Sequence, residues 1–363
     1  MRQLLTWFLL VLVTTVWAAP DADSTDVEQP VRKMSWLRRT IQNFSKIDTC
    51  YVEPQHYNWS VMLQATHTYD YYRLSTTGQN SQSFTFSPEP NFKLGPYFGW
   101  RWIFLGYTFD LKNIDVSNSS LKQEIVFSLY SARVGVDLFF RRTGRDYHVR
   151  QVSLGDNIDA HSIEGLPFGG INVGITGVNL YYIFNHKRFS YPAAFNQSTR
   201  QKISCGSWMA GIGYMHNYID LDYDKLETLI TDNIGPNVPL SEGLKFNSVE
   251  YTDFNASVGY AYNWVFARNF LFCSSLSLAL AYKRTLGDNN ERRRIDLKNI
   301  NLDGIGRFGL VYNNDRWYAG TSAIVRAYNY KMSTFAANNI FGSLNIYVGY
   351  NFGARSAYKK KSR

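Results

Sequence analysis

Two histidines lie a few residues before carboxylates, a combination that general acid–base catalysis uses. His67 precedes Asp70, and His216 precedes Asp220 and Asp222. A hydrolase built on such a pair would also need an activated nucleophile. No serine lies in a nucleophile-elbow sequence, and no lipase-type His-Ser-Asn-Gly sequence occurs. We therefore expect no catalytic residues and keep a hydrolase only as the third of three candidate functions.

Other chemical motifs are also missing from the sequence. The three cysteines, Cys50, Cys205 and Cys273, are an odd number and do not describe a disulfide framework. No cysteines are paired in sequence and no two histidines lie four apart, so no metal-ligand spacing occurs. The glycine-rich stretch 167–177 lies in or before a predicted strand with no helix after it, unlike a phosphate loop. We expect neither a metal nor a cofactor.

Charged residues instead occur in segments in which every second side chain is apolar. In residues 253–264 (DFNASVGYAYNW), the even positions from Phe254 to Trp264 are apolar, and the odd positions from Asp253 to Asn263 are small or polar. A repeat of two is that of a β-strand, whose side chains alternate between two faces. The same parity places these side chains on polar faces: Asp70, Lys93, Asp110, Glu124, Asp137, Arg141, Asp253, Asn255, Lys283, Arg307 and Arg326.

Twelve segments with this alternation follow one another. They span 58–71, 83–98, 102–112, 122–131, 134–150, 171–185, 203–217, 249–264, 270–285, 300–312, 317–331 and 339–352. Short turns and long polar loops alternate between them, except for the long link 186–202, where a short turn is due. Long strands with this sorting of loops are typical of outer-membrane barrels. The sequence therefore predicts an all-β protein, a transmembrane antiparallel β-barrel of about twelve strands with short periplasmic turns and long extracellular loops.

The composition also favours a membrane barrel over a soluble exported domain. Aromatic residues make up 16% of the 363 residues and charged residues only 18%, below the roughly 25% that soluble domains contain. The mean hydropathy is −0.28, because each strand of such a barrel is only half apolar. The net charge of +9 could suggest nucleic acid, but an exported barrel would not meet it. We expect no nucleic-acid partner.

The first residues are typical of a secretory signal. A basic start precedes the apolar run from Leu4 to Trp17, which is too short to span a membrane. We place the cleavage after Ala18, or after Ala19 as the second choice, and the mature chain in the outer membrane of a Gram-negative bacterium. The division is then a signal peptide at 1–18, a periplasmic N-terminal segment at 19–57, the transmembrane barrel at 58–352 and a basic C-terminal tail at 353–363.

Four stretches resemble a family of uncharacterised outer-membrane barrel proteins of Bacteroidales, known only as a domain of unknown function. They are KIDTCYVEPQHYNWSVMLQ (46–64), LGPYFGWRWIFLGYTFDL (94–111), RFSYPAAFNQSTRQKISCGSWMAG (188–211) and GYAYNWVFARNFLF (259–272). The stretch at 188–211 is the most specific. The resemblance implies a Gram-negative outer membrane, but it carries over no activity and no catalytic residues.

The mixed charges of the predicted lumen leave three functions open. The first is non-catalytic passage or binding of small molecules through the lumen. The second is a structural or lipid-organising barrel whose lumen is closed by paired charges. The third is a hydrolase at the rim. A barrel of twelve strands lies between the filled interior of eight and the open channel of sixteen, so the N-terminal segment or the link 186–202 could plug it.

The expected partners are those of an outer-membrane protein. They are outer-membrane lipids, lipopolysaccharide, the barrel-insertion machinery during assembly and an unknown small solute. The basic loop ERRR (291–294) is expected outside the cell, where lipid phosphates offer a partner. The loop 218–248 is long enough to fold over the mouth of the barrel, so we expect a lid or a ligand site there.

Overall fold

The computed structural model describes residues 47–77, 81–100, 103–106, 109–110, 123–155, 158–285, 300–331, 335–355 and 358. Ile47–Gly353 forms one compact unit. The signal peptide, the N-terminal segment before residue 47, the ERRR loop and most of the basic tail lie outside the described residues. Among the helices that are described, none is long and apolar enough to cross a membrane.

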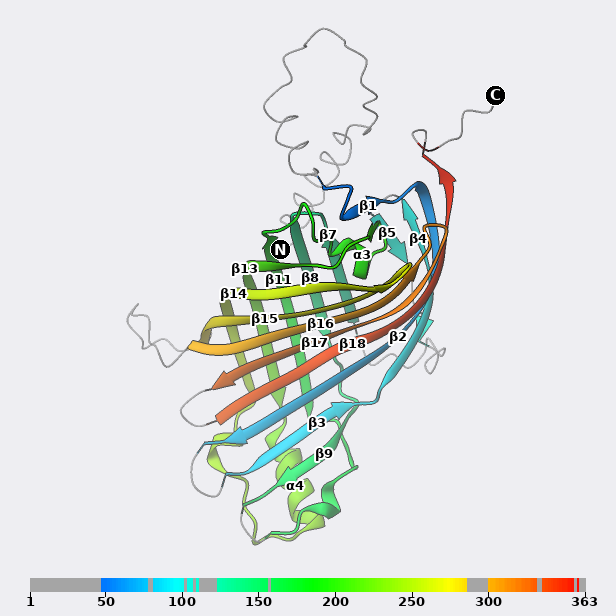
Figure 1. Cartoon of the computed structure of the whole chain (residues 1–363). Helices are drawn as coiled ribbons and strands as arrows, with labels where there is room; N and C mark the ends of the chain where they lie inside the picture. Colours follow the sequence, from blue (N-terminus) through cyan, green and yellow to red (C-terminus); the bar gives the residue numbers. More distant parts are fainter. Residues whose placement is uncertain are drawn as a thin grey trace, which may run out of the picture. The chain divides into compact units, whose positions relative to one another are not determined.

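Most of this part of the chain lies in one antiparallel sheet of 16 strands (Figure 1). Its strands are β2 (Tyr57–Thr76), β3 (Ser83–Pro88), β4 (Asn91–Trp100), β5 (Ile103–Gly106), β6 (Phe109–Asp110), β7 (Gln123–Tyr130), β8 (Val134–Arg142), β9 (Tyr147–Ser153), β10 (Pro167–Phe168), β11 (Ile171–Ile183), β13 (Cys205–Leu221), β14 (Ser248–Ala267), β15 (Phe270–Thr285), β16 (Ile300–Asn313), β17 (Trp317–Lys331) and β18 (Phe335–Ala354).

The connections hold a smaller sheet and short helices. β1 (Val52–Pro54) pairs with β12 (Thr199–Gln201) in a separate antiparallel sheet of two strands. The described helices are α3 (Pro192–Phe195), α4 (Tyr223–Asn233), η2 (His161–Ile163) and η3 (Glu242–Leu244).

All twelve predicted strands are confirmed, and three of them are each represented by two described strands. The strand predicted at 83–98 divides into β3 and β4 at Pro90, which has no amide hydrogen for the ladder. The strand predicted at 134–150 divides into β8 and β9 around Gly144, whose φ is 73°. The strand predicted at 102–112 is represented by β5 and β6, and residues 107 and 108 between them lie outside the described residues. With β10, these pairs of strands account for the 16 strands of the sheet.

One predicted loop is wrong. The sequence predicts a long connection at 332–338, but β17 runs to Lys331 and β18 begins at Phe335. Phe335 and Ala337 are buried, while Ala336 and Asn338 on the opposite face are half-buried. The outer face of this strand end therefore lacks the large apolar residues by which the other strands are identified.

The sheet closes on itself through hydrogen-bonded neighbours. β10 pairs with β9, β9 with β3, and β3 with β2, and β2 lies beside β18. From β18 the order continues through β17, β16, β15, β14 and β13 to β11. β10 and β11 are separated only by Gly169 and Gly170, so they act as one strand that joins both ends of the series. The result is a closed barrel.

The outer face of the barrel is apolar and its inner face is polar. In β14, Phe254, Val258 and Trp264 are 59%, 57% and 53% exposed, whereas Asp253 and Asn263 are fully buried. At about 3.4 Å per residue and a tilt of about 40°, the span from Phe254 to Trp264 covers about 26 Å along the barrel axis. The apolar band of transmembrane barrels is about 25 Å tall. The protein is therefore a transmembrane antiparallel β-barrel.

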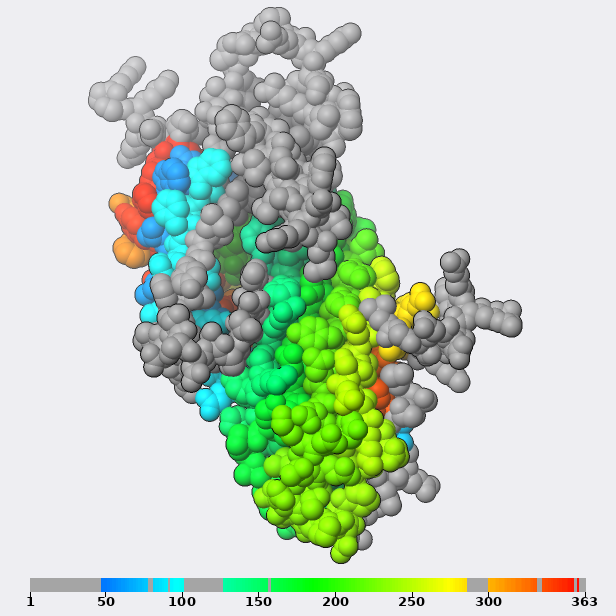
Figure 2. Space-filling model, turned by 180° about the vertical axis from the view of Figure 1, so that it is seen from behind, coloured from blue at the N-terminus to red at the C-terminus, as the bar shows by residue number. Residues whose placement is uncertain are grey.

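The two ends of the barrel differ. We call the end that holds β1 and α3 the plug end, and the end that holds α4 the cap end; Figure 1 shows them at the top and bottom, respectively. Seen from behind in Figure 2, the yellow-green residues at the tip of the cap end belong to the region of β13, α4 and the start of β14. The lumen between these ends holds the candidate site.

Candidate functional site

The lumen contains three layers of side chains that follow one another along the strands. On β14, Tyr251 belongs to an apolar layer at the cap end, Asp253 to a charged layer, and Ala261 to an apolar layer at the plug end. On β16, Asp303 and Arg307 belong to the charged layer, whereas Val311 lies in an apolar cluster at the plug end. The charged layer is thus enclosed between two apolar ones.

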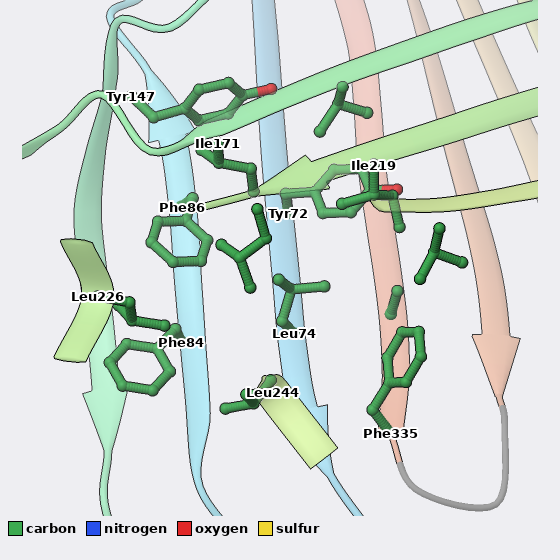
Figure 3. Packing of buried hydrophobic residues seen from close by; sticks show 14 of the residues in the cluster. Tyr72, Leu74, Phe84, Phe86, Tyr147, Ile171, Ile219, Leu226, Leu244 and Phe335 are labelled. Carbon is green, nitrogen blue, oxygen red and sulfur yellow. The ribbon is translucent and has the colours of Figure 1, made fainter. Parts of the chain in front are cut away.

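The apolar layer at the cap end, which we call the cap core, joins the ends of the strands to the connections that follow them (Figure 3). Phe84 and Phe86 of β3 are fully buried, and the same cluster includes Leu226 of α4, Leu244 of η3 and Phe335 of β18. Most of the loop predicted at 218–248 is therefore folded onto this core. A hydrophobic cluster with members from helices and several strands seals the cap end.

Buried ion pairs cross the charged layer from one wall to another. Arg307 of β16 is bonded to Asp137 of β8, although β15, β14, β13 and β11 lie between these strands in the sheet. Nη2 of Arg141 in β8 lies 3.4 Å from Oδ2 of Asp70 in β2. A charge buried here without a partner would cost several kcal/mol. The two pairs therefore bind distant walls together and occupy the middle of the lumen.

Lys283 of β15 lies between two carboxylates. Its Nζ is 3.3 Å from Oδ2 of Asp253 and 3.1 Å from Oδ2 of Asp303, and it donates to the carbonyl of Asn329 at 2.6 Å. Lys283 and the two aspartates are at most 2% exposed. One ammonium group thus lies between two buried carboxylates and bonds to both walls that carry them.

Arg326 of β17 is a further buried cation of the layer. Its guanidinium lies over the rings of Phe139 and Phe341, at 5.6 and 5.8 Å from their centroids. Its Nε and Nη2 have no hydrogen-bond partner among the described residues, and the side chain is only 3% exposed. Among the described side chains, the buried acids and bases of the layer are equal in number: Asp70, Asp137, Asp253 and Asp303, and Arg141, Lys283, Arg307 and Arg326.

A small cavity lies on the side of this layer that faces the plug end. Its volume is about 30 Å³, and its lining includes Asn179, Tyr181, Asn255 and Arg307. Nε of Arg307 and the hydroxyl of Tyr181 have no hydrogen-bond partner among the described residues. A polar cavity of this size has room for about one water molecule. It is too small for an organic solute.

The link 186–202, which we call the plug, fills the other end of the lumen. The hydroxyl of Tyr191 donates to Oγ of Ser275 in β15 at 2.6 Å. Nε2 of Gln197 donates to the hydroxyl of Tyr347 in β18 at 2.8 Å. Because Ser275 and Tyr347 are buried residues of the barrel strands, these bonds place the plug inside the barrel.

Apolar contacts complete the seal around the plug. Ala194 of α3 is fully buried in a cluster with Cys273 of β15 and Val311 of β16. At Gly309 of β16, an added Cβ would meet the carbonyl of Ala194 at 3.3 Å, so the absent side chain lets α3 approach the wall. Both plug candidates of the sequence are involved, because the N-terminal segment contributes β1, which pairs with β12 of the plug.

The other residues predicted for the lumen have fewer described contacts. Lys93 of β4 is half-buried and opposite Asp110 of β6 in register. Glu124 of β7 is opposite Arg141; the side chains of Asp110 and Glu124 are not among those described. Nδ2 of Asn255 donates to Oδ1 of Asp253 at 3.3 Å. The predicted residues that meet in the charged layer are Asp70, Asp137, Arg141, Asp253, Lys283, Arg307 and Arg326.

The two histidines singled out in the sequence lie outside the lumen. His67 stacks on Phe92, which is half-exposed on the outer face, whereas Asp70 is buried on the inner face. A spacing of three residues in a strand places two side chains on opposite faces. His216 is paired with Glu250 at 2.8 Å. No group of three or more metal-ligating side chains occurs within the part of the chain that the structure describes.

The ionisable groups outside the strands that have shifted pKa values include one at each end of the barrel. Burial and the neighbouring Arg133 lower the pKa of His186 at the start of the plug. His186 therefore stays neutral and accepts a hydrogen bond from Arg133 at 3.0 Å. At the N-terminus of α4, bonds from the side chain and amide of Lys225 lower the pKa of Asp222. The ionised carboxylate of Asp222 caps the helix.

Some parts of the site go unpredicted by the sequence. Asp303 has the same parity as Arg307 on β16, so the alternation was enough to identify it. Tyr191 and Gln197 lie in the plug, which has neither a helical nor a strand period. Their burial depends on the barrel around them, which local sequence does not encode.

A transmembrane β-barrel with a filled lumen is the class that the fold and this site define. The chain belongs to the family described as a domain of unknown function, DUF4421, which it matches over residues 46–352. This confirms the resemblance to a family without an assigned function. No curated protein matches the chain.

Several solved structures are similar at low identity. The outer membrane protease OmpT from Escherichia coli is 6% identical, with 81% of this chain and 97% of that chain covered at a TM-score of 0.37. The translocator domain of the autotransporter NalP from Neisseria meningitidis is 10% identical (81% and 89%, TM-score 0.31). The toluene transporter TodX from P. putida is 8% identical (82% and 91%, TM-score 0.26). Similarities of this size assign no activity.

Proposed function

We propose that the protein is a non-catalytic outer-membrane barrel that is closed at rest and passes small polar solutes when the plug leaves the lumen and the cap core parts at the other end. The mature chain, after removal of residues 1–18, would lie in the outer membrane of a Gram-negative bacterium, with lipids and lipopolysaccharide against its apolar face. The observation that carries the proposal is the charged layer enclosed between two apolar ones.

A charged layer is not needed to fill a lumen, because apolar side chains fill it with equal or greater stability. Replacing buried ion pairs with packed apolar side chains is often neutral or stabilising. Here eight buried acids and bases occupy the middle of the barrel, and donors of Arg326 and Arg307 have no partner among the described residues. Such a lining suits water and polar solutes. Its balanced charge would favour neither cations nor anions strongly.

Passage without catalysis agrees with the positions of the histidines. His67 and Asp70 are on opposite faces of β2, and His216 is paired with Glu250 on the outside of the barrel. General base catalysis needs an acceptor within hydrogen-bond reach of the proton that it removes. Neither histidine has a buried nucleophile in its described contacts.

A second candidate is a permanently closed structural barrel, favoured by the bond between Arg307 and Asp137. This pair joins walls that are far apart in the sheet, and it would have to separate or shift for a solute to pass. In this case removal of the plug would leave the lumen closed.

Conductance of the purified protein in planar bilayers separates these candidates. We expect wild type to be silent and a variant with residues 187–202 replaced by a short Gly/Ser turn to conduct. Lys187→Ala, which changes an exposed plug residue, is the control and should stay silent. If the plugless variant folds, as judged by heat-modifiable mobility on gels, and is silent, the barrel is structural. Conductance by wild type would contradict closure at rest.

A further inference from the structure

The plug is bonded to the N-terminal segment as well as to the barrel wall. β1 and β12 form their own antiparallel sheet, in which Glu53 and Arg200 are directly opposite. The amide of Lys202 donates to the carbonyl of Tyr51 at 2.7 Å, so main-chain bonding continues beyond the end of the sheet. The segment before the barrel thus holds the plug through its main chain.

Charged side chains extend this contact to two turns of the wall. Arg200 is paired with Glu53 and donates to Oδ1 of Asn269 at 3.0 Å. His56 lies 3.3 Å from Glu53 and 2.7 Å from Asp315. Asn269 and Asp315 occupy the turns after β14 and β16 with φ of 69° and 78°, a region that Asn and Asp adopt more readily than most residues. Both turns therefore direct a polar side chain to this group.

These bonds are open to water, unlike the plug that they hold. The side chains of Glu53, His56 and Arg200 are 25%, 26% and 31% exposed, whereas Phe189 and Tyr191 are fully buried. Partly exposed ion pairs are weak and depend on their surroundings. A group of such bonds at the mouth of the lumen can be released without unfolding the barrel.

We propose that residues 48–56 are a latch that keeps the plug in the lumen, and that release of β1 from β12 lets the plug leave. This inference rests on the proposed function, since a latch has a purpose only if the plug can move. Opening would then be controlled by the N-terminal segment rather than by the barrel wall.

Charge reversal at the latch tests the inference. Arg200→Glu places a second carboxylate opposite Glu53, and the double variant Glu53→Arg/Arg200→Glu restores the pair in reverse. Arg268→Glu makes the same charge change at an exposed position in the neighbouring turn and is the control. All four proteins are studied as full mature chains that show heat-modifiable mobility.

Cys273 provides a second measurement besides conductance. Its thiol is fully buried in the cluster that includes Ala193 and Ala194 of the plug, so a charged, membrane-impermeant thiol reagent can reach it only when the plug has moved. Cys50 is exposed and reports that the reagent is active in every sample. Peptide mass spectrometry distinguishes these two thiols from each other and from the half-buried Cys205.

We expect Arg200→Glu to label Cys273 about tenfold faster than wild type and to show channel openings, which corresponds to ~1.4 kcal/mol. The double variant and Arg268→Glu should match wild type. If Arg200→Glu stays closed while the plugless variant conducts, the latch is wrong and the proposed function stands. A double variant as open as Arg200→Glu also overturns the latch, because damage to the plug would then explain the opening. If wild type itself conducts, the proposed function is wrong, and the latch, which rests on it, is wrong as well.

Discussion

The cap end and the plug end both close the lumen with apolar side chains, but they are built differently. The cap core takes members from strand ends of the wall itself, such as Phe86 and Phe335, together with α4 and η3. The plug is a single link that enters the barrel and is held by side-chain bonds such as those of Tyr191 and Gln197. One seal is part of the wall, and the other is an insert. Only the insert can leave while the wall stays intact.

Phenylalanines that are fully buried in the two seals provide the strongest test of this difference. Phe86→Ala removes a ring from the cap core, which should lower the free energy of unfolding by about 3–5 kcal/mol. It should leave the labelling of Cys273 unchanged, because the plug is intact. Urea unfolding in detergent micelles measures the first effect, and thiol labelling measures the second.

Phe189→Ala is the matched change in the plug, where Phe189 is also fully buried. We expect a smaller loss of unfolding free energy, because the barrel strands do not depend on the plug, and faster labelling of Cys273. The comparison between the two seals fails if Phe86→Ala also exposes Cys273, or if Phe189→Ala unfolds the barrel as strongly as Phe86→Ala does.

A second prediction concerns the wall that both seals close. Val258 lies near the middle of the apolar band on β14 and Trp264 at its edge, both exposed on the outer face. Val258→Arg should destabilise the barrel by about 2–4 kcal/mol, and Trp264→Arg by only about 0–1 kcal/mol from the charge, because the penalty falls toward the membrane interface. Reversible unfolding in lipid vesicles measures both. Equal penalties at the two depths would show that the band is not centred on β14 as inferred.

The wall is also the part that could be predicted from the sequence. The alternation of Phe254 to Trp264 with Asp253 to Asn263 follows from strand geometry alone, and it locates both the lipid face and most of the charged layer. The interruptions at Pro90 and Gly144 follow from the residue types themselves, because proline has no amide hydrogen for the ladder and glycine readily adopts a positive φ. Parity assigns a face, but it does not show which charges meet across the lumen.

The ion pairs across the lumen and the plug could not be predicted in the same way. The pairing of Arg307 with Asp137 depends on barrel closure, which brings together residues 170 positions apart. The plug has no period, and its burial results from polar bonds to strands that follow it in the chain, such as the one to Ser275. Sequence alone therefore identifies 186–202 as unusual for its position and as one of two candidate plugs, without predicting which of its side chains bond to the wall.

A third prediction separates the effect of the plug's hydrogen bonds from that of its apolar contacts. Tyr191→Phe removes the hydrogen bond to Ser275 and keeps the ring in place. It should weaken the plug by about 1 kcal/mol, which raises the labelling rate of Cys273 by about fivefold at most. Ser275→Ala in the same protein should restore part of this loss, because it removes the hydroxyl that was left without a partner. No change in either variant would mean that apolar packing alone retains the plug.

The smallest effect is expected at the cap end of the barrel, where Asp222 is the N-cap residue of α4. The pKa of Asp222 is lowered by its bonds to Lys225, so its contribution to stability is present above the unfolded pKa of about 3.9 and is lost as the pH falls through the lower folded pKa. Asp222→Ala should destabilise α4 by about 1 kcal/mol near neutral pH. Hydrogen exchange of the α4 amides at neutral pH and near pH 3 measures this.

Asp222→Asn separates the contribution of the helix-capping hydrogen bond from that of the carboxylate charge. Asparagine caps helices about as well as aspartate, so this variant should keep α4 protected at neutral pH and lose the dependence on pH. Neither substitution should change the labelling of Cys273, because the other members of the cap core still close that end. If fraying of α4 did expose Cys273 to the reagent, the route to this thiol would lie at the cap end, and its use as a reporter of plug movement would be wrong.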